Sequence, residues 1–300
     1  MDSTRTNIEI RALARLDDMY QAVALQRVYW GTDTESIVPA QVLFTMAMYG
    51  GHVLAAMDGE RMVGLLIGLL GTNVHEPENR PAMTNLVLAS KRMMVLPDYR
   101  GEGIATQLKL AQRDTAIKQG IRLVTWTFDP LLSINAHLNF RKLATVSQIF
   151  HENLYGTRDE TGLAVLGRSD RLRVDWWVTN RRVEERLNGR RTDLKLAQYI
   201  DAGTQIINPT TFVDGFATPP ASLIECAGSF ALLEIPLNFP TIVQKNRTLA
   251  QQWQDQVREG IKKLFASGYI VTDFLRDEHE GRERAFYLWS LDMGFDFSLN

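Results

Sequence analysis

The turn Arg100-Gly101-Glu102-Gly103-Ile104-Ala105-Thr106 contains residue types that suit the binding of a phosphate group. Gly101 and Gly103 allow the backbone to fold tightly, and they carry no side chain that would keep a phosphate away from it. The residues after Gly103 predict a helix, whose first amides have no partner within the helix and whose dipole favours an anion. Arg100 adds a planar guanidinium that can donate to two phosphate oxygens. The turn is therefore predicted to hold the phosphates of a cofactor.

Two well-known phosphate-binding motifs do not match this turn. It lacks the Gly-Lys-Ser/Thr ending of a P-loop, and it lacks the three-glycine dinucleotide motif with its downstream acidic residue. Glycine pairs also occur in strand-to-helix turns that bind nothing. A plain connection therefore remains the alternative for the turn considered alone.

The elements on either side of the turn would position it. Leu86 to Val95 predicts a strand that Pro97 ends. Gly103 to Gln119 predicts an amphipathic helix, and Arg122 to Phe128 predicts the next strand. The turn is thus predicted to lie at the carboxyl end of a strand and the amino end of a helix.

The surrounding patterns predict an alternation of strands and helices through residue 178. The elements expected are strands at Ile8 to Arg11, His52 to Met57, Met62 to Leu70, Thr145 to Tyr155 and Arg171 to Trp177, and helices at Asp17 to Val28, Pro39 to Ala47 and Ser133 to Lys142. Asp58-Gly59 is the predicted hairpin turn between the second and third of these strands. This order predicts an α/β (α+β) fold with a mixed central sheet and helices on both faces.

The pattern after residue 178 is less regular. It predicts a polar connection at Arg181 to Ala217, a strand at Phe230 to Ile235, a helix that begins at the capping box Thr248-Leu249-Ala250-Gln251, and strands at Tyr269 to Leu275 and Ala285 to Leu291 joined by a charged turn. We expect a first domain over residues 1–178. Residues 179–300 are expected to form a smaller α/β extension that packs on the first domain and helps to form the acceptor site.

Composition narrows the classes of function. With 33 basic and 35 acidic residues the net charge is -2, so no basic footprint for nucleic acid is expected. Met62 to Leu70 is the longest apolar run, about half of the roughly 20 residues that a membrane span needs. The first residues lack the apolar core of a signal peptide, and the lone Cys226 fits a reducing compartment. The sequence thus predicts a cytoplasmic chain that binds neither membrane nor nucleic acid.

The turn and the order of elements around it resemble the GNAT superfamily of N-acetyltransferases. The family signature Arg/Gln-x-x-Gly-x-Gly/Ala is matched by Arg100, Gly103 and Ala105, and the resemblance covers roughly residues 7–178. Two segments, Trp126 to Leu131 and Ser169 to Trp177, look like those of a little-characterised bacterial subgroup with an extended C-terminal region.

This resemblance implies a donor and a set of binding residues. Acetyl-CoA, or another acyl-CoA, would be the co-substrate, and its acyl group would pass directly to the amine of a small molecule or a protein, without a metal. The arm of CoA would lie between the strand that ends at Val95 and the strand Arg122 to Phe128. The binding residues that the resemblance implies are Met93, Met94, Val95, Arg100, Gly101, Glu102, Gly103, Ile104, Ala105, Thr106 and Ser133. The sequence leaves open whether the chain forms a homodimer.

The sequence departs from the family at the position of the usual proton donor. Alignment of the segment 133–143 places Phe140 where the family commonly has a tyrosine that protonates the departing thiolate, and Phe140 has no proton to give. Tyr155 is our tentative general acid in its place, with His137 and His151 as alternatives. A half-buried packing role is the other interpretation of such a tyrosine.

The general base is also open. A free alkyl amine has a pKa near ~10, so a side chain must accept its proton or burial must lower its pKa. Asp129 is the tentative candidate, although a residue that precedes Pro130 is commonly a turn former, and Glu234 is the other. Loss of the acid would leave a non-catalytic acyl-CoA-binding or interaction protein on the same scaffold.

Overall fold

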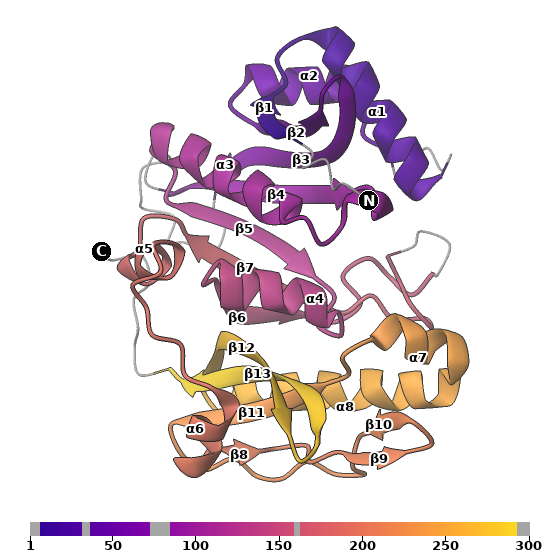
Figure 1. Cartoon of the computed structure of the whole chain (residues 1–300), viewed down its shortest axis with the longest axis vertical. Coiled ribbons are helices and arrows are strands. Elements are labelled where there is room, and N and C mark those ends of the chain that lie inside the picture. The colour runs from indigo at the N-terminus through magenta and orange to yellow at the C-terminus, as the bar shows by residue number, and fades with distance from the viewer. Residues whose placement is uncertain (1–6, 32–36, 73–84, 159–162, 293–300) are drawn as a thin grey trace. The chain divides into compact units, whose positions relative to one another are not determined.

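The computed structural model describes residues 7–31, 37–72, 85–158 and 163–292, and the chain divides into two compact units, Met1–Trp126 and Thr127–Asn300 (Figure 1). The division falls within β5 (Leu123–Phe128), and so within the domain that was expected to span residues 1–178. The expected boundary at 178 stays a prediction. The first six residues, in which no signal peptide was found, lie outside the described residues.

The sheet of the first unit has the strand order β1 (Ile8–Ala12), β2 (His52–Asp58), β3 (Arg61–Thr72), β4 (Leu86–Val95) and β5. Neighbouring strands are antiparallel except for β4 and β5, which are parallel, so the sheet is mixed as predicted. Asp58 pairs with Arg61, which leaves a two-residue hairpin turn whose Gly59 has a φ of 58°.

Helices cover both faces of this sheet, as the sequence predicts. Leu65 and Ile67 of β3 are fully buried in one cluster with residues of α1 (Leu16–Trp30) and α2 (Ala40–Met48). Because side chains alternate along a strand, Gly64 and Gly68 point to the opposite face. A Cβ at Gly64 would lie 3.2 Å from Leu108 Cδ1, so glycine lets α3 (Ile104–Lys118) pack closely there.

The sheet of the second unit extends into the C-terminal residues. Its strand order is β7 (Arg171–Trp177), β6 (Val146–His151), β12 (Tyr269–His279), β13 (Arg282–Leu291), β11 (Phe230–Ile235) and β8 (Gln205–Ile206). Val271 of β12 pairs with Ser147 of β6. Residues after 178 are therefore part of the same sheet as β6 and β7.

Two predicted boundaries in this unit are wrong. The strand expected at Thr145 to Tyr155 ends at His151, because Asn153 takes a left-handed φ of 47° and the chain turns. The charged segment expected as a turn, Arg276 to Glu283, is mostly paired strand, and an ion pair of 2.9 Å between its two ends crosses the β12–β13 hairpin.

The stretch expected as a plain polar connection contains short elements. These are α5 (Arg181–Leu187), α6 (Leu196–Asp201), β8, β9 (Thr211–Val213) and the start of β10 (Phe216–Thr218). The predicted helix start is also wrong. Asn246, and not Thr248, caps α8 (Arg247–Ala266), because its side chain accepts from the Leu249 amide, and α7 (Phe239–Lys245) precedes it.

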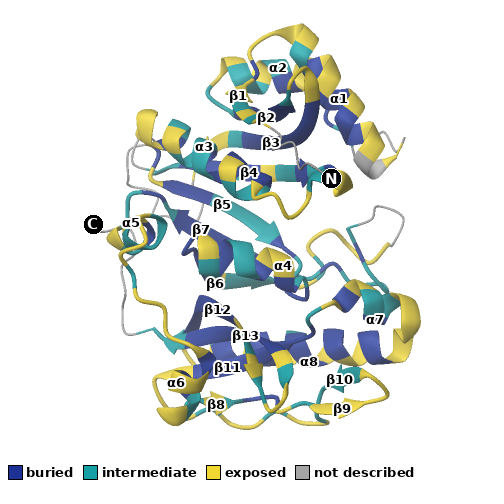
Figure 2. Cartoon of the chain, viewed as in Figure 1, coloured by how far each residue is buried: buried dark blue, intermediate teal, exposed yellow. Residues whose placement is uncertain are grey.

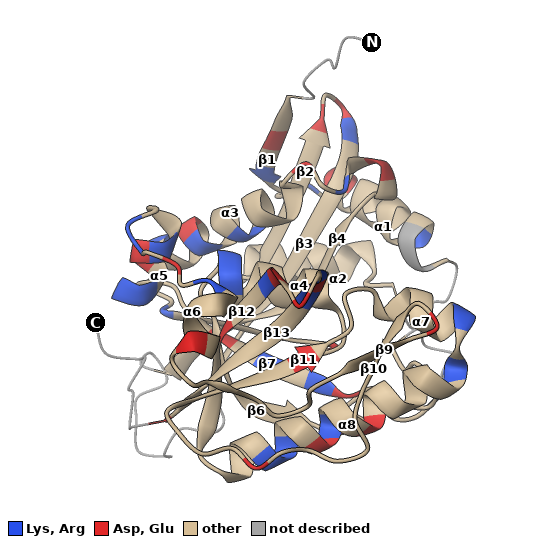
Figure 3. Cartoon of the chain, turned by 60° about the horizontal axis from the view of Figure 1, so that its bottom comes forward, with Lys and Arg blue, Asp and Glu red and all other residues tan. Residues whose placement is uncertain are grey.

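The long helix α8 provides much of the core of the second unit. Its buried stripe, coloured dark blue in Figure 2, contains Leu249, Trp253, Val257, Ile261 and Leu264, which are the residues predicted for it. Acidic and basic residues alternate along its other face (Figure 3). No helix in the described residues is both long enough and apolar enough to cross a membrane.

Candidate functional site

The glycine turn of the first unit leads into a helix and is exposed at its glycines. After β4 the chain passes through the 3-10 turn η3 (Pro97–Tyr99), and Gly101 and Gly103 adopt φ angles of 90° and 78°. Glycine adopts this left-handed region without strain. Gly103 is the N-cap of α3 and has no side chain to satisfy the first amides of the helix, which lack helical acceptors. Gly101, Glu102 and Gly103 are exposed, so a phosphate can approach these amides.

The edge of β4 that faces β5 is open along its second half. Parallel pairing runs from Val87 with Leu123 to Ala89 with Thr125 and goes no further between the described residues of the two strands. β4 itself continues to Val95, paired with β3 on its other edge. The two strands therefore separate beyond Ala89.

The direction of the peptide groups along β4 shows which residues have backbone N–H and C=O groups at the open edge. The Leu96 amide donates to the Val63 carbonyl of β3. Because peptide groups alternate in direction along a strand, those of Met94 also point to β3, whereas those of Met93 and Val95 point to the open edge. The assignment of Met93 and Val95 to CoA stays a prediction, and Met94 directs its peptide groups towards β3.

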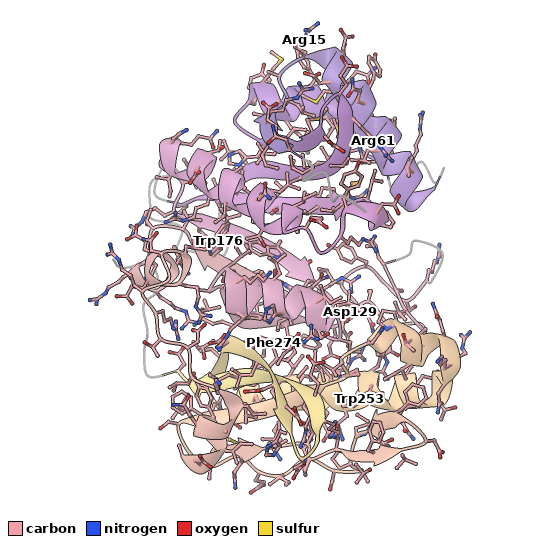
Figure 4. The ribbon with its side chains drawn as sticks, in the orientation of Figure 1. Arg15, Arg61, Asp129, Trp176, Trp253 and Phe274 are labelled. Atoms are coloured by element: carbon pink, nitrogen blue, oxygen red, sulfur yellow. The ribbon has the colours of Figure 1, made fainter. Side chains whose placement is uncertain are left out.

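Arg100 lies against the end of β4. Its Nε donates to the Val95 carbonyl at 3.3 Å, so this carbonyl is engaged while the Val95 amide faces the open edge. The preceding Tyr99 is anchored to the β2–β3 hairpin, because its hydroxyl donates to Asp58 Oδ2 at 2.7 Å and Arg61, labelled in Figure 4, stacks over its ring. The hydrogen bond to Asp58 raises the pKa of Tyr99. These contacts connect the start of the turn to the β2–β3 hairpin.

Lys109 of α3 is a polar residue of this region that the sequence did not reveal. Only 2% of its surface is exposed, and its Nζ donates to Ser90 Oγ at 2.9 Å and to Gln112 Oε1 at 3.1 Å. The same nitrogen lies 3.5 Å from the centre of the Trp126 ring. Burial lowers the pKa of Lys109 well below its ordinary value. A lysine within an amphipathic helix pattern is typical of a solvated face, so no sequence signal marked it.

In the second unit, Asp129 follows directly after β5 (Figure 4). Its Oδ1 accepts from the Leu131 amide at 2.9 Å, which is the turn-forming role considered for a residue before Pro130. Its Oδ2 lies 4.0 Å from Arg171 Nη1. Burial raises the pKa of Asp129 above its ordinary value of 3.8, and the Leu131 amide and Arg171 oppose this shift. The carboxylate is thus both a turn former and a group that accepts a proton more readily than usual.

Tyr155 lies in the turn after β6 and near Asp129. Its ring is 46% exposed, its hydroxyl is 3.4 Å from Thr127 Oγ1, and the guanidinium of Arg171 stacks over the ring at 5.4 Å. Arg171 therefore contacts both tentative catalytic residues. The sequence did not single out Arg171, because the folding of β7 beside this turn brings it there and no local pattern predicts that contact.

Phe140 belongs to an aromatic cluster in the second unit. It is fully buried in η4 (His137–Lys142), a π-helical continuation of α4 (Ser133–Ala136). Its ring lies 6.0 Å from that of Phe128 and 5.8 Å from that of Tyr287. The Tyr287 hydroxyl donates to the Pro130 carbonyl at 2.6 Å, and burial raises its pKa well above its ordinary value. Tyr287 thus supports the turn that carries Asp129 through its hydrogen bond to the Pro130 carbonyl.

The remaining predicted polar residues lie in differing surroundings. Ser133 is buried and its hydroxyl donates to the Leu237 carbonyl at 2.5 Å, so its assignment to CoA stays a prediction. His137 is partly buried, and this burial lowers its pKa. His151 ends β6, opposite Arg171 of β7.

Glu234 is buried within a cluster that uses all of its acceptor capacity. Its Oε1 accepts from Arg282 and Arg284, and its Oε2 accepts from Arg284 and from the hydroxyl of Thr210. A carboxylate has about four lone-pair positions. Because these four bonds use them, Glu234 is unsuited to accept a proton from an amine. Asp129 is the better placed of the two candidate bases.

The described residues contain no group of three or more His, Cys, Asp and Glu side chains that could hold a metal ion.

Comparisons with known proteins give similar structures only. No protein-family model matches the chain, and no curated protein matches its sequence. An N-acetyltransferase from Staphylococcus aureus Mu50 is 15% identical with a TM-score of 0.45, over 58% of this chain and 99% of that one. NAA60 of Arabidopsis thaliana in complex with acetyl-CoA is 12% identical with a TM-score of 0.44, over 57% and 99%. An acetyltransferase of the GNAT family from Streptococcus pneumoniae is 14% identical with a TM-score of 0.44, over 56% and 98%. Solved structures similar to this chain thus include members of the family that its sequence resembles.

Proposed function

We propose that this chain is an acyl-CoA-dependent N-acyltransferase that moves an acetyl group from acetyl-CoA directly to the amine of a small molecule or a protein. The observation that carries the proposal is the continuity of two binding features in the first unit. An anion-accepting turn at Gly101 to Thr106 follows directly from β4, whose edge is open beyond Ala89. CoA has one group for each of these two features. Its pyrophosphate would bind the turn, and the amide groups of its arm would bind the open edge.

The residues of the turn fit the pyrophosphate of CoA. The amides from Gly101 to Thr106 would donate to its oxygens at the positive end of the α3 dipole. The open-edge peptide groups of Met93 would bond the amides of the arm, as a neighbouring strand does. Bound acyl-CoA would supply a thioester, and the Val95 amide is the donor proposed to stabilise the oxyanion.

We propose Asp129 and Tyr155 for the two proton transfers. Asp129 would accept the proton of the acceptor amine, supported by the raised pKa that burial gives it. Tyr155 would protonate the departing thiolate, supported by its partly exposed hydroxyl and its shared contact with Arg171. In the reaction the amine nitrogen bonds to the acyl carbon, the carbon–sulfur bond breaks and the sulfur receives a proton.

Acetyl-CoA binding tests the donor site first. At a hundred times its dissociation constant, acetyl-CoA should add about 2.7 kcal/mol to the free energy of unfolding. Gly103→Ala should remove most of this gain, because its φ of 78° is strained for alanine and an altered turn would misdirect the amides. Gly59→Ala is the matched control, since it has a φ of 58° and equally open surroundings in the β2–β3 turn. Equal stabilisation of all three proteins by acetyl-CoA would rule out the turn as the donor site.

A non-catalytic acyl-CoA-binding protein is the second candidate function. The complete burial of Phe140 between Phe128 and Tyr287 favours it, because the usual proton donor has become part of an aromatic core. Release of free CoA thiol in the presence of amines, polyamines, amino acids and peptides separates the two. Turnover with any acceptor supports the transferase, whereas acetyl-CoA binding without thiol release across all of these classes supports the binding protein.

A further inference from the structure

The amine of Lys109 lies at the point where β4 and β5 separate. Ala89 and Thr125 form the last paired positions of the two strands, and Ser90 and Trp126 are the next residues of each. The Lys109 amine contacts both of them, the hydroxyl of Ser90 at 2.9 Å and the ring of Trp126 at 3.5 Å. One side chain of α3 thus contacts the residue of β4 and the residue of β5 that directly follow the last β4–β5 pair.

This contact has a cost for the fold. No acidic side chain of the described residues forms an ion pair with Lys109, which is almost fully buried. Its partners are the acceptors Ser90 and Gln112 and the π-face of Trp126. An apolar side chain of similar length would fill the same space without burial of a polar amine. Packing alone therefore does not explain why residue 109 carries an amine.

We propose that Lys109 is a positioning residue for acyl-CoA, which fixes the point where β4 and β5 separate and so shapes the closed end of the opening for the CoA arm. The inference rests on the proposed function. Ser90 and the Met93 edge belong to the same strand, so a change in where the strands separate would alter the direction of the peptide groups that bond the arm. The anion-accepting turn lies at the other end of β4 and does not involve Lys109.

Two ligands distinguish positioning from general support of the fold. Lys109→Met keeps the length of the side chain and removes its amine. We expect acetyl-CoA to bind about tenfold more weakly, the change expected when the polar contacts of one group are lost. The nucleotide portion of CoA without the pantetheine arm should bind as it does to the unchanged chain, because it needs only the turn. Lys118→Met, an exposed position of the same helix, is the control and should alter neither affinity.

A second substitution tests the contact itself. Ser90→Ala removes one acceptor of the amine and should weaken acetyl-CoA binding in the same direction, and the double variant should lose less than the sum of the two single losses. Equal loss of both ligands in Lys109→Met, or unchanged acetyl-CoA affinity in both single variants, would overturn the proposal. If the unchanged chain bound neither ligand, the proposed function would fail instead.

Discussion

Asp129 combines a structural bond with a raised pKa, and this makes its two roles separable by substitution. Asn at this position keeps an oxygen that can accept from the Leu131 amide but cannot take up a proton. Asp129→Asn should therefore preserve the fold and lower acetyl transfer by roughly a hundredfold or more, the usual size of a general-base contribution. For the unchanged chain the rate should fall at acidic pH, where Asp129 becomes protonated, and this acidic limb of the pH dependence should be absent in Asp129→Asn. Tyr155→Phe should leave that limb in place and lower the rate, because Phe has no proton to give to the thiolate.

The same substitution changes stability in a direction that the pKa shift determines. The pKa of Asp129 is higher in the folded chain than its ordinary 3.8, so between these values the folded chain binds the proton more readily than the unfolded chain. The free energy of unfolding therefore falls as pH rises through this interval. Urea unfolding at several pH values should show a smaller fall for Asp129→Asn. Asp201→Asn, an exposed position in the same unit, should follow the unchanged chain, and an identical pH dependence for Asp129→Asn would show that Asp129 is not the group that titrates.

At the scale of the element, the close contact of α3 with the sheet depends on Gly64 and Gly68 of β3. A Cβ at Gly64 would lie 3.1 Å from Ala56 Cβ and 3.2 Å from Leu108 Cδ1, which is tighter than ordinary contact. Gly64→Ala should lower the free energy of unfolding by about 1–3 kcal/mol, as expected for overpacking. Gly71→Ala is the control, because the same strand has open space there. Equal denaturant midpoints for the two variants would show that the helix accommodates a methyl group.

Elements with a regular pattern could be predicted from the sequence, and elements set by distant contacts could not. The periodicity of α3 and α8 and the glycine turn before Ile104 are local signals, and the structure confirms them. Tyr155 was expected at the end of a strand. The fold instead turns at Asn153, which is bonded through its side chain to Arg258 of α8, more than a hundred residues later. The open edge of β4 likewise depends on pairing with β5, which the order of residues does not reveal.

Polar residues buried by tertiary contacts were the hardest to assign. Asp129 was identified because it follows a strand that the family resemblance marks. Lys109 and Arg171 gave no signal, because each becomes informative only when a neighbouring strand supplies its partners. Glu234 was a candidate base as a charge on an apolar strand, and the two arginines of β13 that engage it lie about fifty residues further along the chain.

At the scale of the whole molecule, the C-terminal residues complete the second unit. β12 pairs with β6, and Tyr287 of β13 packs on Phe140 and bonds the Pro130 carbonyl beside Asp129. Arg258 of α8 bonds both carboxylate oxygens of Asp170, in the segment that precedes β7. The turn that carries Tyr155 and the turn that carries Asp129 are both supported by residues after 178.

A chain that ends after residue 178 should therefore fail to form a stable second unit. Because this shortened chain lacks β12, β6 would have an unpaired edge. Because it lacks Tyr287, Phe140 would be exposed to water. We expect the shortened chain to show no cooperative unfolding transition for residues 127–178 and fast amide exchange in β6 and β7, measured by hydrogen exchange with mass spectrometry. Arg258→Ala in the full chain is the milder test, with faster exchange confined to residues 152–158 and 169–171. Slow exchange throughout β6 and β7 in the shortened chain would show that residues 1–178 fold independently, as the expected domain boundary implies.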